Sequence, residues 1–199
     1  MDTFTEDQCE IFEAYKRGEN IFMTGPGGCG KSYLIKHMIE HSNDPKHTQV
    51  CAMTGCAAVL LECGATTLHS WAGIGLCKNV EDHIIITRIS MNKYKRKKWK
   101  QTNVLIIDEV SMMSKRLFEL LDQIGKKIRN NSKPFGGIQV IFSGDFYQLP
   151  PIGDRGDPDS HKFCFESPLW SETFDTQILL DKLFRQQDDD YRNILNQIR

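Results

Sequence analysis

A glycine-rich run carries the clearest chemistry in the sequence. Residues 25–32 read Gly-Pro-Gly-Gly-Cys-Gly-Lys-Ser, which matches the phosphate-binding pattern G-x-x-x-x-G-K-[ST]. Glycines let backbone N–H groups turn inward around a phosphate, and a following helix adds its positive N-terminal end. In this pattern Lys31 reaches the β- and γ-phosphates and Ser32 holds Mg²⁺. The expected nucleotide-binding residues here are Gly25, Pro26, Gly27, Gly28, Cys29, Gly30, Lys31, Ser32 and Tyr33.

Two adjacent acids end a later apolar run, residues 104–107. We expect Asp108 to bind Mg²⁺, usually through water, and Glu109 to orient and deprotonate an attacking water. Such a pair favours a hydrolase over a kinase. The alternative is that the acids cap the next helix with help from Ser111. Residues 92–95 lack the final Asp of the guanine-reading pattern N-K-x-D, so we expect ATP rather than GTP.

The cysteines bear on the compartment. There are seven, no two of them spaced as C-x-x-C, so we expect neither a disulfide framework nor a zinc site but a reducing environment. The helix after the glycine-rich run could acidify the Cys29 thiol. The favoured interpretation of Cys29 is a small residue that fills a tight turn.

These chemical groups need elements to position them. Short apolar runs predict strands at 20–24, 49–53, 104–107, 138–142 and 177–180. Helical periodicity predicts helices at 31–42, 56–62 and 116–129. Apolar strands that alternate with helices predict an α/β fold, a parallel sheet with helices on both faces. Ligands of such sheets bind at the carboxyl ends of the strands, where the motifs fall.

Composition limits the class of protein. With 199 residues, 40% hydrophobic and 26% charged, the chain suits one globular domain and is too hydrophobic for a disordered protein. No apolar run reaches the roughly 18–20 residues that a membrane helix needs, and the acidic N-terminus resembles neither a secretory signal nor a transit peptide. The net charge is −1, so any affinity for nucleic acid must come from local patches.

The motifs together resemble a known family. The segments that carry the resemblance are, in order along the chain, 24–32, 54–58, 66–75, 105–112, 134–139, 143–151, 163–167 and 184–186. Together they closely resemble the motifs of the petite-integration-frequency (PIF-type) DNA helicases, superfamily-one motors that move 5′ to 3′ on single-stranded DNA. The similarity runs from about Phe4 to the last residue. It implies that residues 1–199 are the first RecA-like lobe of such a P-loop NTPase.

The resemblance implies roles for three more residues. Gln8 looks like the adenine-reading glutamine, and its alternative is a surface glutamine at a helix start. Gln148 resembles the residue that senses the γ-phosphate and links it to the DNA track, and its alternative is a plain loop residue. Arg185 looks like the arginine that stabilises the transition state with its fixed charge; its alternative is a surface salt bridge. With Lys31 and Glu109, Gln148 and Arg185 complete the expected catalytic set.

DNA contacts are expected by the same resemblance. Small hydroxyls and exposed N–H groups suit phosphate contacts that carry no sequence information. Trp71 or Phe146 could offer a face for base stacking, although either could equally belong to the core. We expect no metal at His69, because no partner ligand lies at suitable spacing. The expected DNA-binding residues are Thr54, Gly55, Thr67, His69, Ser70, Trp71 and Phe146.

Two segments have open interpretations. Residues 93–100 hold six basic residues and two aromatics; a solvated helical turn is favoured over a DNA patch or a nuclear-import signal. Residues 152–162 correspond to an element that wedges the duplex apart in the family, but so short a segment makes an extended pin doubtful, and a plain surface loop is the alternative. We expect residues 188–199 to form a partly unsupported helix.

The resemblance also implies partners. Motors of this class hydrolyse ATP between two RecA-like lobes, and this chain holds only the first. We therefore expect a fragment or a natural short form. It should bind ATP–Mg²⁺, bind DNA weakly and unwind no DNA alone. Expected partners are single-stranded and forked duplex DNA and a second lobe in the full-length protein, with no membrane and a monomeric state. The nucleus or mitochondrion is expected if the source is eukaryotic. The alternatives are a DNA-binding module without motor activity and, disfavoured by residues 144–151, an unrelated P-loop ATPase.

Overall fold

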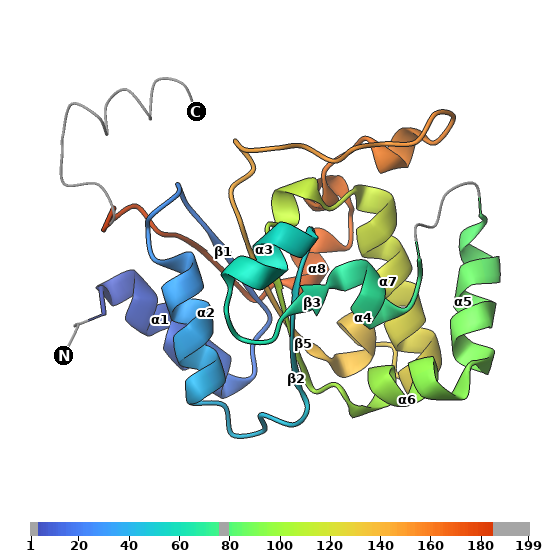
Figure 1. Ribbon diagram of the computed structural model, residues 1–199, viewed down its shortest axis with the longest axis horizontal. Helices are drawn as coiled ribbons and strands as arrows, with labels where there is room; N and C mark the ends of the chain where they lie inside the picture. The colour runs from blue at the N-terminus through green and yellow to red at the C-terminus, as the bar shows by residue number, and fades with distance from the viewer. Residues whose placement is uncertain (1–3, 76–79, 185–199) are drawn as a thin grey trace.

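The centre of the protein is a parallel β-sheet. The computed structural model describes residues 4–75 and 80–184 (Figure 1). Six strands lie in the order β3-β2-β4-β5-β1-β6, and every neighbouring pair is parallel. All five predicted strands are confirmed; β3 was missed because two residues leave no periodic signal. The strands are β1 (Ile21–Thr24), β2 (Thr48–Ala52), β3 (Thr66–Thr67), β4 (Val104–Asp108), β5 (Gln139–Gly144) and β6 (Thr176–Leu179).

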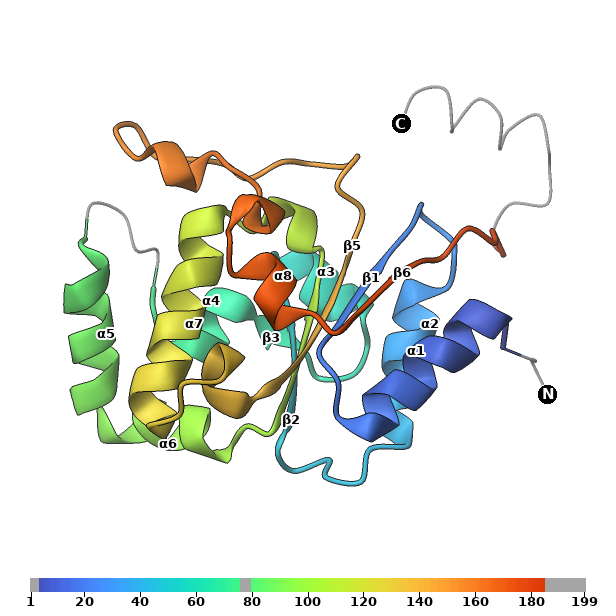
Figure 2. The ribbon, with the colours of Figure 1, turned by 180° about the vertical axis from the view of Figure 1, so that it is seen from behind.

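Helices cover both faces of this sheet, as predicted (Figures 1 and 2). On one face lie α1 (Glu6–Arg17), α2 (Lys31–Glu40) and α3 (Gly55–Leu60). On the other lie α4 (Leu68–Ala72), α5 (Asp82–Met91), α6 (Lys93–Gln101), α7 (Lys115–Arg129) and α8 (Trp170–Thr173). Short 3₁₀ helices are η1 (Val110–Met112), η2 (Pro134–Gly137), η3 (Pro158–Ser160) and η4 (Cys164–Glu166).

Side chains of the central strands alternate between two cores. In β1, Phe22 joins the core under α4–α8, whereas Ile21 and Met23 join the core under α1–α3. In β4, Ile106 and Ile107 divide in the same way. Both faces of these strands are buried, which explains why their sequences are continuously apolar rather than alternating.

Local signals set the helix ends. Helix α7 begins one residue before the predicted 116–129 because the Ser114 hydroxyl accepts a hydrogen bond from the Leu117 N–H. Helix α2 ends at Glu40, earlier than the predicted 31–42. The helices α4 and α5 were not predicted. Helix α4 has five residues, and the Ile-rich, β-branched sequence of α5 lowers helix propensity. No described helix is long and apolar enough to cross a membrane.

The sheet register gathers three strand ends at one edge. Thr24 pairs with Gly144, and Ile107 pairs with Phe142, so β1, β5 and β4 finish side by side. The segments that follow these strands are the glycine-rich loop, the acidic pair and the loop that holds Gln148. Helix α6 lies at the opposite edge, just before β4 begins (Figure 1).

Candidate nucleotide and DNA site

The glycine-rich loop between β1 and α2 depends on glycine at two positions. Gly30 has φ +94°, and a Cβ there would lie 2.6 Å from Nε2 of Gln8. Gly25 has φ +151°, and a Cβ there would collide with the backbone carbonyl oxygen of Leu180. Both conformations disfavour a side chain. The loop is therefore packed between α1 and the segment that follows β6.

The Lys31 ammonium lies within the loop. Its Nζ donates hydrogen bonds to the carbonyl oxygens of Gly25 at 2.6 Å and Pro26 at 3.0 Å, and it lies 3.7 Å from Sγ of Cys29. The Cys29 side chain is only 1% exposed, which fits a small residue that fills a tight turn. Any contact of Cys29 with a nucleotide would therefore use its backbone.

The acidic pair combines a buried carboxylate, that of Asp108, with a residue whose backbone is strained, Glu109. Oδ1 of Asp108 accepts a 2.7 Å hydrogen bond from the hydroxyl of Ser143, and both residues are buried. Glu109 has φ +59°, a conformation that costs free energy in a residue other than glycine and is found at functional sites. Burial, and after it the negative charge of Asp108, raises the pKa of Glu109 above its ordinary value. A carboxylate with a raised pKa is a better proton acceptor near neutral pH.

A cavity of about 530 Å³ joins these groups. It unites the loop, the acidic pair and Gln148, which the sequence separates by more than a hundred residues, and its volume is within the range of small-molecule sites. Phe184 also lines it and was not anticipated. The lining residues are Gly27, Gly28, Gly30, Lys31, Ser32, Tyr33, Asp108, Glu109, Gln148 and Phe184.

Asp145 orients the Gln148 side chain. Its Oδ2 accepts a 3.2 Å hydrogen bond from Nε2 of Gln148, and its Oδ1 accepts one from the backbone N–H of Tyr147. Asp145 is only 2% exposed. The sequence placed Asp145 inside a recognised motif without giving it a role. The structure links it to Gln148, and thereby to the cavity.

Gln8 is buried against the loop. It lies in the first turn of α1, and its Oε1 accepts a hydrogen bond from the Thr5 N–H in a reciprocal capping box. Its exposed fraction is 3%, so the alternative of a surface glutamine is wrong. Nε2 of Gln8 lies beside Gly30, while Tyr33 packs edge-on against Phe4. Arg185 lies outside the described residues.

The residues expected to contact DNA backbone gather at the carboxyl ends of β2 and β3. Ala52 pairs with Thr67, which brings Thr54 and Thr67 close together. Both hydroxyls accept hydrogen bonds from helix N–H groups, as N-caps of α3 and α4, and each can still donate its own proton. Gly55 and Ser70 are exposed. Thr54, Gly55, Thr67 and Ser70, with His69 between the last two, therefore lie together at these strand ends, and we call these five residues the strip.

His69, and Trp71 outside the strip, lie deeper than the other residues of the strip. Burial lowers the pKa of His69, so its imidazole is neutral at pH 7 and can offer a phosphate an N–H donor but no positive charge. Trp71 is 2% exposed and packs on Trp99 with ring centroids 4.5 Å apart. The expectation that Trp71 offers a stacking face is therefore wrong, because its ring lies on the side of α4 that packs into the core.

Aromatic residues near Gln148 are more accessible. Phe146 is half-buried and packs edge-on against Phe165 and Phe163, so only part of its ring is open. Tyr147 is 74% exposed and Phe165 42% exposed. Sequence reasoning missed both, because exposure of a ring within a loop leaves no periodic signal.

The segment 152–162 is tied to the start of α7. Nη1 of Arg116 donates to Asp157 at 2.8 Å, while its Nε and Nη2 donate to Asp82 at the start of α5. Lys115 pairs with Asp159 at 3.0 Å. The segment contains η3 and is a loop anchored at several points rather than a free tail.

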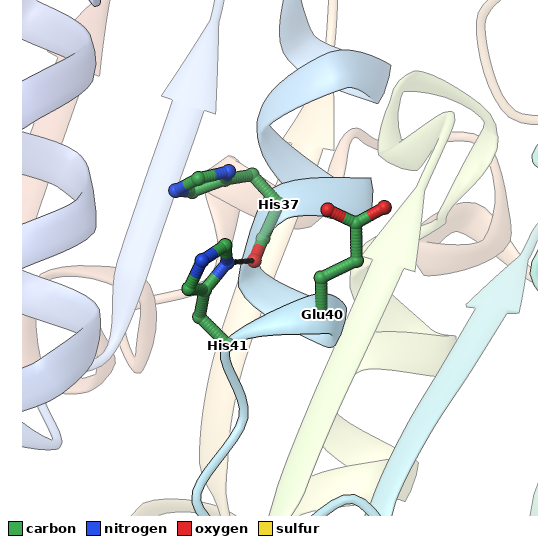
Figure 3. Close-up of side chains that lie close together, drawn as sticks. All are labelled: His37, Glu40 and His41. Atoms are coloured by element: carbon green, nitrogen blue, oxygen red, sulfur yellow. Dashed lines mark hydrogen bonds between the residues drawn. The ribbon is translucent and has the colours of Figure 1, made fainter.

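One other cluster offers metal ligands among the described residues. Ligand atoms of His37, Glu40 and His41 lie within 4.8 Å of one another near the end of α2 (Figure 3). Nδ1 of His41 is already hydrogen-bonded to the His37 carbonyl oxygen at 3.0 Å. Ser32 begins the same helix about two turns away. Mg²⁺ prefers oxygen ligands, and two of the three ligands in this cluster are imidazoles. The oxygen atoms of Ser32 and Asp108 therefore fit Mg²⁺ better than this cluster does.

A phosphate-binding loop after β1 and an acidic pair after β4, on a parallel sheet between helices, define a P-loop NTPase with the RecA-like fold. A family model described as PIF1-like helicase matches residues 3–197. The chain therefore belongs to the PIF1-like helicase family, as the resemblance had indicated.

Individual relatives agree with this family. The chain is 42% identical over 187 residues to the ATP-dependent DNA helicase RRM3 of Saccharomyces cerevisiae, covering 92% of this chain and 25% of that protein. It is 37% identical over 195 residues to human PIF1, covering 98% of this chain and 29% of that protein. The chain thus spans between a quarter and a third of the length of these two relatives.

Solved structures share the fold. The Pif1 helicase from Candida albicans superposes with a TM-score of 0.89 at 39% identity, over 98% of this chain and 44% of that chain. The Bacteroides Pif1 helicase in complex with ADP-AlF3 and single-stranded DNA superposes with a TM-score of 0.81 at 31% identity, over 98% of this chain and 46% of that chain.

Proposed function

We propose that residues 1–199 are the first ATPase lobe of an ATP-dependent 5′-to-3′ DNA helicase. The observation that carries this proposal is the cavity in which Lys31, Glu109 and Gln148 meet. Relatives of the chain are named ATP-dependent DNA helicases, and a neighbouring structure holds a nucleotide analogue and single-stranded DNA. A P-loop site beside a DNA strip is the arrangement that such a motor requires.

The residues divide the hydrolysis among them. Loop N–H groups and Lys31 bind the phosphates of ATP, and Ser32 and Asp108 hold Mg²⁺, which neutralises phosphate charge when bound. Glu109 accepts a proton from the attacking water as the water oxygen bonds to the γ-phosphorus. The bond to the ADP oxygen breaks, and ADP leaves with its electron pair. Arg185 supplies positive charge to the transition state. Gln8, with Tyr33 nearby, binds the adenine.

The strip at β2 and β3 carries the DNA backbone. Thr54, Gly55, Thr67, His69 and Ser70 contact phosphates without reading sequence. Phe146 with Tyr147 and Phe165 offers aromatic surface to bases. Gln148 lines the nucleotide cavity and directly follows Tyr147 in the chain, so it connects nucleotide state to the DNA. The anchored segment 152–162 separates the strands at a fork.

A second RecA-like lobe in the full-length protein completes the motor. Translocation needs two lobes whose separation changes with the nucleotide. The full-length protein acts as a monomer on single-stranded and forked DNA, in a reducing compartment within the cell, which is the nucleus or mitochondrion in a eukaryote.

The test compares the full-length protein with its Lys31→Ala variant. We expect single-stranded DNA to stimulate ATP hydrolysis in the wild type and the variant to lose that hydrolysis. Duplexes with either a 5′ or a 3′ tail report polarity, and only the 5′-tailed one should be unwound. Nucleotide binding without turnover in the wild type would favour a DNA-binding module without motor activity. Strand separation by residues 1–199 alone would refute the single-lobe assignment.

A further inference from the structure

Helix α6 concentrates positive charge that the nucleotide site does not use. Six of its nine residues are basic: Lys93, Lys95, Arg96, Lys97, Lys98 and Lys100. No Asp or Glu occurs between Asp82 and Asp108, although the whole chain has a net charge of −1. The cations of α6 are therefore not balanced by acids nearby in the sequence.

Contacts in the folded chain do not balance them either. Over residues 4–75 and 80–184, no carboxylate forms an ion pair with any of these six side chains. Within the described part of the chain, only the Lys95 ammonium of these six forms a hydrogen bond, at 2.5 Å to the Gly73 carbonyl oxygen. Like charges four residues apart, such as Lys93 with Lys97, destabilise a helix. The repulsion among these cations destabilises α6, and no acidic side chain compensates it. An uncompensated local cost of this kind points to a function.

The helix is nevertheless held firmly. Trp99 is fully buried, and its indole N–H donates to the Ala72 carbonyl at 3.1 Å. The Asn92 side chain caps the first turn. Arg129, in the last turn of α7, donates to the carbonyls of Trp99, Lys100 and Thr102. The cations are thus displayed on a fixed helix, not on an extended strand.

We propose that the exposed cations of α6, which we call the basic face (Lys93, Arg96, Lys97 and Lys100), bind the backbone of duplex DNA at a second site. The face lies at the amino end of β4, a strand length of roughly 17 Å from the edge that holds Asp108. The strip that contains Thr54 and Thr67 lies at the opposite, carboxyl ends of β2 and β3. The α6 side chains that contact the end of α4, Lys95 and Trp99, are not part of the basic face. The identity of the ligand as DNA rests on the proposed function.

Charge and shape favour duplex DNA as the occupant. Duplex DNA carries a negative charge about every 1.7 Å, so a helix of about 14 Å with this density of cations faces several phosphates at once. Single-strand sites combine a groove with aromatic side chains on which bases stack. Helix α6 is convex, and the only aromatic side chain that it exposes is Tyr94. A membrane surface is disfavoured because interfacial helices bury an apolar face, and the Trp99 side of α6 faces the core.

The test neutralises part of the face in the full-length protein. The variant is Lys97→Gln/Lys100→Gln, and the matched control is Lys16→Gln/Lys46→Gln, which removes the same charge from exposed lysines on α1 and on the loop before β2. Fluorescence anisotropy measures the affinity of each protein for a blunt duplex and for a single strand across salt concentrations. Circular dichroism checks that each variant is folded.

We expect the variant to lower the slope of log affinity against log salt on the duplex by about 1.8, or about 0.9 for each lost phosphate contact. Its affinity for the single strand and its DNA-stimulated ATP hydrolysis should match those of the control. A duplex slope equal to the control, or an equal loss on single-stranded DNA, would overturn the second site. DNA-stimulated hydrolysis by the wild type tests the proposed function separately.

Discussion

The Ser143 hydroxyl donates a 2.7 Å hydrogen bond to Oδ1 of Asp108, across the boundary between β5 and β4. Ser143 is fully buried and Asp108 is 6% exposed. A buried carboxylate is costly unless hydrogen bonds compensate it. The hydroxyl satisfies one oxygen of Asp108 and leaves the other oriented by that bond, so Ser143 positions the proposed Mg²⁺ ligand.

Replacing Ser143 by Ala is therefore expected to leave Asp108 without its donor. We expect the free energy of unfolding to fall by about 1–3 kcal/mol and the Mg²⁺ concentration that supports nucleotide binding to rise. Chemical denaturation and titration of a fluorescent ATP analogue measure the two effects. Ser171→Ala, an exposed serine in α8, is the control. Unchanged Mg²⁺ dependence would remove the positioning role from Ser143.

Glu109→Gln separates chemistry from binding. Loss of a general base is expected to slow ATP hydrolysis by about 10²–10⁴-fold while nucleotide affinity persists, which single-turnover kinetics and equilibrium binding distinguish. Hydrolysis at the wild-type rate would exclude Glu109 as the base.

The same variant is expected to change how stability depends on pH. Because the pKa of Glu109 is raised above 4.5 in the folded state, the folded protein binds this proton more tightly than the unfolded chain does. Stability is therefore lost as pH rises from 4.5 through the raised pKa. Glu109→Gln should be more stable than the wild type at neutral pH, with the difference vanishing below pH 4.5. Melting temperatures across pH measure it, and a variant less stable at neutral pH would contradict the sign.

Asp145 and Gln148 are expected to act as one unit. Asp145→Ala removes the acceptor that orients Gln148, so it should reduce DNA-stimulated hydrolysis about as much as Gln148→Ala does. The double variant should be little worse than either single variant, because coupled residues are not additive. A double-mutant cycle on the stimulated rate measures the coupling. Additive losses would show that the hydrogen bond between them carries no function.

Truncating Trp71 and truncating Tyr147 should affect different properties, the first the stability of the fold and the second the affinity for single-stranded DNA. Trp71→Ala should lower the free energy of unfolding by about 3–5 kcal/mol as a core truncation. Tyr147→Ala should leave the fold intact and weaken single-strand affinity by about 1–3 kcal/mol if a base stacks on it. Denaturation and anisotropy titrations read the two effects. A stable Trp71→Ala variant with impaired DNA binding would reverse this assignment.

The sequence predicts best what repeats or is spaced in a fixed way. The strands around Ile106 and Ile141 are continuous apolar runs, and the phosphate loop has its own spacing, so both were predictable. The burial of Trp71 and Gln8 was not, because it depends on partners, Trp99 and Gly30, that lie far off in the sequence. The hydrogen bonds of Ser143 and Asp145 were likewise invisible before the strands were placed side by side.

The phosphate loop is joined to the end of the described chain. Phe184 donates its backbone N–H to the Gly28 carbonyl at 2.9 Å, and Leu180 approaches Gly25 so closely that a methyl group would not fit. Arg185 is the next residue along the covalent chain. Any displacement of Gly25 or Gly28 would therefore also displace the peptide 180–184, so one short stretch of backbone couples the glycine-rich loop to the end of β6.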